Sequence, residues 1–289
     1  MVATGRRPAM PTDAFDLAAY LARIGLAEAP SGDLAGLTML QWAQLQAIPF
    51  ENLDISQGRG IDASPAAVFA QLVTARRGGY CHQCNGLLHQ ALEALGFDSR
   101  LIGGRVLLDA VDGGVPARSH TLVLVDLPEG VFLADCGFGA QTPRRPLLLV
   151  EGATASRGRM TWQVDRDPRF GWRVSLTEGG QTQALYVFDL SVRHPIDITL
   201  ANHWSATSPD SIFTQGPLAV RHRADGRLVL FGGKVASRSE AGLESRSIAD
   251  VEVLLEVLEG DFGLRLDPTA EEKECLASSL DKSRSKSGL

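Results

Sequence analysis

The chain is poor in cysteine and has no long apolar run. Its 289 residues contain four cysteines, which are too few for a disulfide scaffold in a chain of this size. They are Cys81, Cys84, Cys136 and Cys275. No window approaches the roughly 18 apolar residues of a membrane span, and no apolar run of signal-peptide length follows the N-terminal residues. We therefore expect a cytoplasmic protein without a membrane partner, whose cysteines remain thiols.

An excess of positive charge is also missing. The 34 acidic and 28 basic residues give a formal net charge of −6, without the basic stripe that binding to a phosphate backbone requires. Nucleic acid is therefore not an expected partner. The chain has no internal repeat or Pro-rich linker, and its hydrophobic content of 44% is typical of globular proteins. We expect its sections to pack as one unit around a shared interior.

The first third of the sequence has the apolar spacing of helices between recognisable caps. Gly25 is placed to end the first helix, Pro49 to follow the second, and Pro65 to occupy the first position of the third. The predicted helices run from Ala14 to Ile24, from Thr38 to Ala47, and onward from a cap at Ser64. Residues 1–97 are thus predicted to form a helical bundle.

From about Ser99 the apolar period changes to two, which is typical of strands. The predicted strands are Leu101 to Leu108, Thr121 to Val125, Val131 to Cys136, Leu147 to Val150, Trp162 to Val164, Trp172 to Leu176 and Ala184 to Phe188. Residues 98–192 are therefore predicted to form a small antiparallel sheet or barrel.

The last part of the chain has a mixed pattern. Residues 193–277 are predicted to contain a helical turn near Asp197 to Trp204, a hairpin of Leu218 to His222 with Leu228 to Phe231, and a helix from a cap at Ser247 to about Leu258. Residues 278–289 are rich in Ser and Lys and are predicted to be disordered.

The most informative segment surrounds Cys81, which begins a predicted helix after Gly78-Gly79-Tyr80. Leu88, Leu92 and Leu95 share its face, so this face is predicted to be buried. Burial raises the pKa of a thiol, whereas the free N–H groups at a helix start and a histidine partner lower it. If the second effect is larger, Cys81 is a thiolate nucleophile; otherwise it is a buried structural cysteine.

A predicted hairpin supplies the partners that a cysteine nucleophile needs. A four-residue loop from Asp126 to Glu129 would place His120 opposite Asp135, with their Cβ atoms about 5 Å apart. Asp135 would then fix the tautomer of the imidazole, and His120 would take the proton of Cys81. A loop of another length shifts this register, and both residues could also be ordinary strand-end residues.

The run Cys81-His82-Gln83-Cys84 also has the C-x-x-C spacing of redox pairs and zinc half-sites. A thioredoxin-like pair would follow a β-strand in a βαβ unit, whereas the preceding segment is predicted to be helical. A zinc site would need further ligands from Cys136 and His120, but no second C-x-x-C or matching histidine spacing supports one. We therefore predict no metal site.

Four separate motifs share one pattern. They are Ile48-Pro49-Phe50-Glu51-Asn52-Leu53-Asp54, Arg77-Gly78-Gly79-Tyr80-Cys81 with Asn85, Arg118-Ser119-His120, and Asp135-Cys136-Gly137-Phe138-Gly139. In their order and separation they resemble the arylamine N-acetyltransferase family. The likeness extends from about Phe15 to Asp267, which is nearly the whole chain.

This resemblance implies an α+β fold with an N-terminal helical bundle, a central antiparallel β-barrel, a C-terminal α/β lid and a cysteine-protease-like Cys-His-Asp core. It implies that Cys81 is the nucleophile, His120 the base and Asp135 the orienting acid. The implied reaction is ping-pong transfer of an acetyl group from acetyl-CoA, through a cysteine thioester, to an arylamine or arylhydrazine. Acetyl-CoA is then a co-substrate, and no bound cofactor is implied.

The resemblance also implies where the substrates lie. Phe50, Val106 and Phe138 are expected to line the acceptor pocket, and Gly137 and Gly139 to lie beside the pantetheine of CoA. The protein is expected to be a monomer or a homodimer.

The sequence departs from the family pattern near the nucleophile. Gln83 stands where a glutamate is usual, so we expect activity to shift in pH or to weaken. His82 replaces the usual Phe or Tyr and is expected to face solvent. Cys136 replaces a small apolar residue and is expected to point away from Asp135. Ser208-Pro209 stands in place of the usual His-Pro.

Other activities could use the same residues. Cysteine hydrolases and transglutaminase-like enzymes share the Cys-His-Asp set and differ in whether water or an amine attacks the thioester. An amide synthase that closes a macrocycle from a carrier-bound acyl chain is the nearest alternative, and a wider pocket without CoA contacts would distinguish it. A non-catalytic binder of arylamine or CoA is a further alternative, against which the complete triad weighs.

Overall fold

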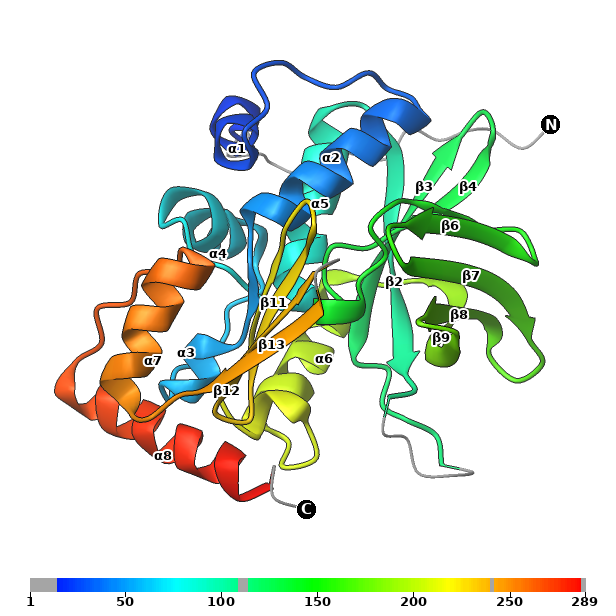
Figure 1. The fold of residues 1–289 in the computed structure, drawn as a ribbon. Helices are drawn as coiled ribbons and strands as arrows, with labels where there is room; N and C mark the ends of the chain where they lie inside the picture. The colour runs from blue at the N-terminus through cyan, green and yellow to red at the C-terminus, as the bar shows by residue number, and fades with distance from the viewer. Residues whose placement is uncertain (1–14, 109–113, 240–241, 287–289) are drawn as a thin grey trace.

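The computed structural model describes residues 15–108, 114–239 and 242–286, which form an α+β structure (Figure 1). The predicted helix start at Ala14 and residues 287–289 of the predicted tail lie outside these ranges. Within the described ranges, no helix is both long and apolar enough to cross a membrane. The helices are α1 (Leu17–Ile24), α2 (Leu34–Ala47), α3 (Leu53–Ser56), α4 (Pro65–Phe69), α5 (Cys81–Ala94), α6 (Pro195–Thr207), α7 (Val251–Val257) and α8 (Ala270–Lys286).

The N-terminal helices begin and end at residues with a local physical reason. The carboxylate of Asp33 accepts a hydrogen bond from the N–H of Gly36 at 2.9 Å, so α2 begins at Leu34, one turn before the predicted start at Thr38. α1 ends at Gly25, as predicted, because this residue adopts a φ of 76° that favours glycine.

Eight strands form a nearly closed antiparallel barrel, as predicted. Their order is β5-β4-β3-β2-β9-β8-β7-β6. The first and last strands of this order are consecutive in the chain and lie together, so the two edges of the sheet meet. The strands are β2 (Asp98–Val106), β3 (His120–Leu127), β4 (Gly130–Ala134), β5 (Leu147–Leu148), β6 (Ala153–Arg157), β7 (Met160–Asp167), β8 (Gly171–Glu178) and β9 (Gln181–Val192).

A second antiparallel sheet has the order β1-β10-β11-β12-β13. Its strands are β1 (Phe50–Glu51), β10 (Ala219–His222), β11 (Gly226–Phe231), β12 (Lys234–Ser239) and β13 (Gly242–Ser247). The predicted hairpin is confirmed as β10 and β11. Ser247 does not cap α7, because it pairs with Lys234 at the end of β13; Asp250 is the cap instead.

β1 joins the N-terminal part of the chain to this second sheet, because Phe50 pairs with Val220 of β10. Asn52 strengthens the connection: its side chain accepts from the N–H of Leu218 at 2.7 Å and donates to the carbonyl of Gly216 at 2.9 Å. Both polar ends of this fully buried amide are thus satisfied by backbone groups. Section boundaries near residues 97 and 192 stay a prediction.

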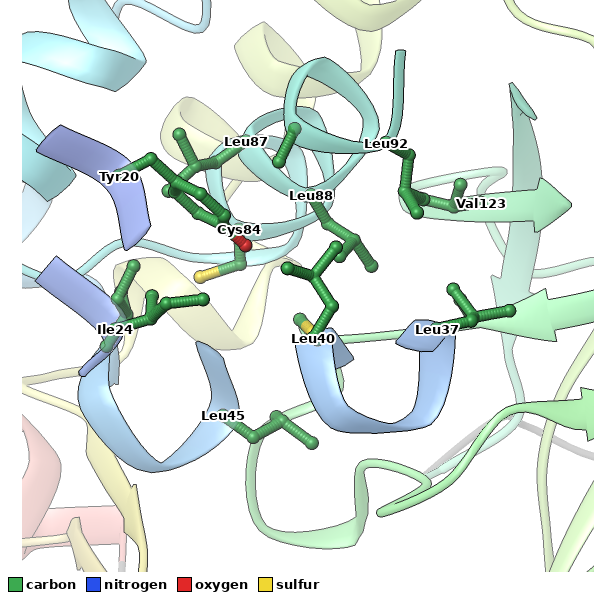
Figure 2. Packing of buried hydrophobic residues seen from close by; sticks show 14 of the residues in the cluster. Tyr20, Ile24, Leu37, Leu40, Leu45, Cys84, Leu87, Leu88, Leu92 and Val123 are labelled. Carbon is green, nitrogen blue, oxygen red and sulfur yellow. The ribbon is translucent and has the colours of Figure 1, made fainter. Parts of the chain in front are cut away.

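The largest apolar cluster lies between the N-terminal helices and one face of the barrel. Figure 2 shows side chains from α1, α2, α5 and β3 meeting in it. Leu40 of α2, Leu88 of α5 and Val123 of β3 are completely buried there. Since α5 is held on this face by its apolar residues, its first turn has a fixed place beside the barrel.

The C-terminal segment is a helix and not the disordered tail that was predicted. α8 continues through residue 286, and Leu276 and Leu280 are at most 1% exposed. Both leucines pack in a cluster with Phe262 and with Leu53 of α3. The prediction was wrong because two leucines four residues apart are enough to hold an otherwise polar helix against an apolar surface.

Replacing Leu88 by alanine should destabilise the protein by about 2–5 kcal/mol, because the lost side chain leaves a cavity in a closed core. Urea unfolding followed by tryptophan fluorescence measures this as a lower midpoint. Met39→Ala is the matched control, since Met39 is 53% exposed and its loss should change stability by less than about 0.5 kcal/mol. Equal midpoints for the two variants would contradict the described packing.

Candidate active site

The first turn of α5 carries Cys81, which is only 3% exposed. The preceding residues allow close packing, because a Cβ on Gly78 would lie 2.3 Å from the carbonyl oxygen of Pro49. The N–H of Tyr80 donates to Oε1 of Gln83 at 3.2 Å. Gln83 therefore caps the helix of the nucleophile, and its predicted effect on the pH range of activity stays a prediction.

His120 and Asp135 form a buried pair, with Nε2 of His120 2.9 Å from Oδ2 of Asp135. The register of the hairpin differs from the prediction, because Leu127 pairs with Gly130 and the turn has two residues in place of four. If this register is continued, the residue opposite Asp135 is two positions away from His120 along β3. A shift of two keeps both side chains on one face, and diagonal neighbours remain within reach of each other.

Asn85 of α5 holds the acid in place. Its Nδ2 donates to Oδ1 of Asp135 at 2.9 Å, and its Oδ1 accepts from the N–H of Cys136 at 2.7 Å. The N–H of Gly137 donates to the same carboxylate at 2.7 Å. α5 therefore carries both the nucleophile and the amide that orients the acid one turn later.

The charged form of the Cys81 thiol is favoured. Burial by itself raises its pKa, but the electrostatic influence of the neighbouring His82 and His120 rings outweighs this effect. Together they hold the pKa of Cys81 well below its ordinary value. A low pKa makes the sulfur a thiolate, which is the nucleophilic form of cysteine.

The partners of Cys81 are charged as well. Burial lowers the pKa of His120, but the charge of Asp135 and its hydrogen bond raise it, and the net result is a pKa of about 9. Burial raises the pKa of Asp135, whereas the charge and hydrogen bond of His120 and the bond from Asn85 lower it, with a net decrease. Thiolate, imidazolium and carboxylate can thus coexist at neutral pH.

Comparison with known proteins agrees with this geometry. The sequence model of a family described as N-acetyltransferase matches residues 33–271. An arylamine N-acetyltransferase of Mycolicibacterium smegmatis is 35% identical over 264 residues, which are 89% of this chain and 94% of that protein. The chain belongs to the arylamine N-acetyltransferase family.

Solved structures of this family have the same fold. The structure of the M. smegmatis arylamine N-acetyltransferase matches with a TM-score of 0.87 at 34% identity, covering 93% of this chain and 100% of that one. A Mycobacterium marinum arylamine N-acetyltransferase in complex with CoA matches with a TM-score of 0.84 at 33% identity, covering 93% and 99%.

Of the residues that the family resemblance assigned to the acceptor pocket, Phe138 contacts His120 and Phe50 lies beside Gly139. Phe138 packs edge-on against His120, with ring centroids 5.0 Å apart. Phe50 borders Gly139, where an added Cβ would lie 3.5 Å from the phenylalanine ring. The third, Val106 of β2, is the register partner of Tyr186 on β9. Its place in the acceptor pocket stays a prediction.

The two glycines assigned to the CoA site are close to the nucleophile or to Phe50. A Cβ on Gly137 would lie 2.7 Å from Cα of Cys81, so any other residue would displace the nucleophile. Gly139 has a φ of 62° and its carbonyl accepts from Nε2 of His222 at 3.0 Å. Gly137 therefore depends on glycine for the close approach of Cys81, and Gly139 depends on it for its left-handed backbone conformation.

A cavity of about 290 Å³ lies between the segment before His120 and α6. Ser119 lines it, and the carbonyl of Ser119 is 3.6 Å from Sγ of Cys81. Arg193 and, from α6, Trp204 form other parts of its wall. Through Ser119 the cavity borders the residue whose backbone contacts the thiol.

The other two buried cysteines face backbone carbonyls. The Cys84 thiol donates to the carbonyl of Gly79 at 3.1 Å, and the Cys136 thiol to that of Gln41 at 3.6 Å. Burial raises the pKa of both well above the ordinary value, so both remain neutral thiols. In the described part of the chain, no group of three or more His, Cys, Asp or Glu side chains is arranged to hold a metal ion.

Two residues of the site were missed or misjudged from the sequence. His82 is only 1% exposed, so the expectation that it faces solvent is wrong. Tyr186 of β9 packs against His120 with ring centroids 5.2 Å apart, and burial and the charge of Asp135 raise the pKa of its phenol. Its strand was predicted, but nothing in a strand pattern separates a site tyrosine from a core one.

Cys81 should react with iodoacetamide at pH 6, where a free thiol of pKa about 8.5 is almost fully protonated. Asp135→Asn should slow this reaction about tenfold or more, because loss of the carboxylate lowers the pKa of His120 and raises that of Cys81. Mass spectrometry of the Cys81 peptide measures the rate across pH 5 to 9.

Asp126→Asn is the matched control for this experiment, because Asp126 lies on the same strand as His120 but pairs with Arg100 at the surface. Its pH profile should equal that of the unmodified protein. An unchanged profile for Asp135→Asn would show that the carboxylate does not support the thiolate.

Proposed function

We propose that this protein transfers an acetyl group from acetyl-CoA to an arylamine or arylhydrazine by a ping-pong mechanism through a thioester on Cys81. The observation that carries the proposal is the buried His120–Asp135 pair beside a thiol whose pKa is lowered. Support comes from the family membership and from the CoA complex of the M. marinum relative.

In the first half-reaction the Cys81 thiolate attacks the carbonyl carbon of acetyl-CoA. A carbon–sulfur bond to Cys81 forms and the bond to the CoA sulfur breaks, while the proton on His120 passes to the departing thiolate of CoA. Nε2 of His120 is held by Asp135, which leaves Nδ1 for this proton. Backbone N–H groups at the start of α5 stabilise the oxyanion.

In the second half-reaction the nitrogen of the amine attacks the acetyl thioester. His120 accepts a proton from that nitrogen, the amide bond forms, and Cys81 leaves as a thiolate. Arylamines suit this step because they are nucleophilic yet largely unprotonated at neutral pH. Burial of Cys81 keeps bulk water from the thioester, which favours transfer over hydrolysis.

The substrate positions follow the family resemblance. Phe50, Val106 and Phe138 line the acceptor pocket in this proposal, and the contact of Phe138 with His120 supports it. Gly137 and Gly139 lie beside the pantetheine of CoA, and the close approach of Gly137 to Cys81 agrees with that place.

The cellular setting and assembly are part of the proposal. The four cysteines are free, which agrees with a reducing compartment and so with the cytoplasm. We propose a monomer or a homodimer, and analytical ultracentrifugation distinguishes the two.

Mixing the protein with acetyl-CoA alone should produce one acetyl adduct on Cys81 and one equivalent of free CoA. Adding an aromatic amine should remove the adduct as the acetylated amine appears. Intact-mass spectrometry and a thiol assay for CoA follow the two steps. Cys81→Ser is the control, because a serine hydroxyl is a much weaker nucleophile than a thiolate. This variant should form no detectable adduct in the time that the unmodified protein needs.

Three results would contradict the proposal. Absence of both adduct and free CoA would indicate a binder without turnover or a different acyl donor. Free CoA without an amine acceptor, at a steady rate, would indicate a hydrolase. Transfer from a carrier-bound chain in place of acetyl-CoA would indicate an amide synthase.

A further inference from the structure

A second imidazole lies inside the active site. His82 follows the nucleophile in the first turn of α5 and is 1% exposed. A buried polar ring needs partners, and each of its nitrogens has one. Nδ1 lies 2.7 Å from Oγ1 of Thr121, and Nε2 lies 3.4 Å from Oγ of Ser205 on α6.

The surroundings of the ring tie it to the triad. Thr121 follows His120 directly on β3, just as His82 follows Cys81 on α5. Two neighbouring residues of the strand thus meet two neighbouring residues of the helix. Asn85 adds a contact between the same elements, because its Nδ2 donates to the carbonyl of Thr121 at 2.6 Å.

The two partners of His82 carry no charge. Both are hydroxyl groups, which can donate to a neutral imidazole nitrogen or accept from a protonated one. His120 differs, since its Nε2 faces the carboxylate of Asp135.

The titratable and charged groups around His82 come from every element packed on it. On its own side are the Cys81 thiol and the Tyr80 phenol, whose ring meets the imidazole edge-on at 5.1 Å. From β3 comes His120. From the segment after β9 comes Arg193, which donates to Oγ1 of Thr121 at 3.0 Å.

We propose that His82 is a second positioning residue of the active site, whose buried imidazole, held by Thr121 and Ser205, stabilises the Cys81 thiolate together with His120. This role rests on the proposed function of Cys81 as the nucleophile. No bond is made or broken at His82: the proton of the thiol still passes to His120.

The electrostatics agree with this geometry. After burial, which raises the pKa of Cys81, the charge of His82 is the largest influence on that thiol and lowers its pKa. A phenylalanine or tyrosine, usual here in the family resemblance, could fill the space but could not carry the charge.

The test is the pH dependence of Cys81 alkylation by iodoacetamide in three variants. His82→Phe removes the charge and both hydrogen bonds, whereas His82→Gln removes the charge but keeps a group that can bond to a hydroxyl. His89→Phe is the control, because His89 is another histidine of α5 and its Nδ1 pairs with Ser99.

Both His82 variants should move the midpoint of the alkylation profile upward by about one pH unit, a tenfold loss of thiolate at low pH. His89→Phe should leave it in place. A wild-type profile in His82→Gln would overturn the proposal, because the ring would then act through hydrogen bonds alone. Wild-type profiles in both His82 variants would also overturn it.

Two features keep this result separate from other failures. Thermal unfolding by circular dichroism shows whether each variant is folded. If His82→Phe does not fold, the alkylation profile of His82→Gln alone tests the proposal. Alkylation does not require acetyl transfer, so a shift in the profile supports the role of His82 even if the acetyl adduct on Cys81 fails to form.

Discussion

The first turn of α5 meets the end of β4 at a separation that only glycine permits. A Cβ on Gly137 would lie 2.7 Å from Cα of Cys81, and the N–H of the same glycine donates to Asp135. The position of the carboxylate therefore depends on the position of the helix. The apolar face of α5 fixes that position, because Leu88 and its neighbours are completely buried between α2 and the barrel. The chemistry of the site thus depends on packing that involves no catalytic group.

The site holds several charges away from water, which is costly unless each charge has partners. Asp135 is completely buried and receives hydrogen bonds from His120, Asn85 and Gly137. With three donors, the carboxylate stays ionised and fixes one nitrogen of His120, which leaves the other for the sulfur. Removing one of the three residues would leave the others as unpaired buried charges, so their effects on the charged state of the site are not independent.

Much of the fold could be predicted from the sequence, because helix caps and strand alternation are local signals. The four motifs pointed to Cys81, His120 and Asp135, whose catalytic roles stay a prediction. The register of the hairpin could not be predicted: Pro128-Glu129 alone forms the turn, and a shift of two still brings His120 to Asp135 since the face is unchanged. The burial of His82 depends on Ser205 of α6, which is 123 positions away. No local pattern reports such a distant contact.

β1 has a consequence for how far the chain can be shortened. Glu51 pairs with Ala219 of β10 through its backbone, while its buried carboxylate lies 2.9 Å from the guanidinium of Arg77, in the segment that leads to Cys81. A truncation before residue 219 would therefore remove the partner of a strand that supports the nucleophile loop. The C-terminal third contains none of Cys81, His120 and Asp135. A fragment must nevertheless include β10 of this third if β1 is to keep its partner strand.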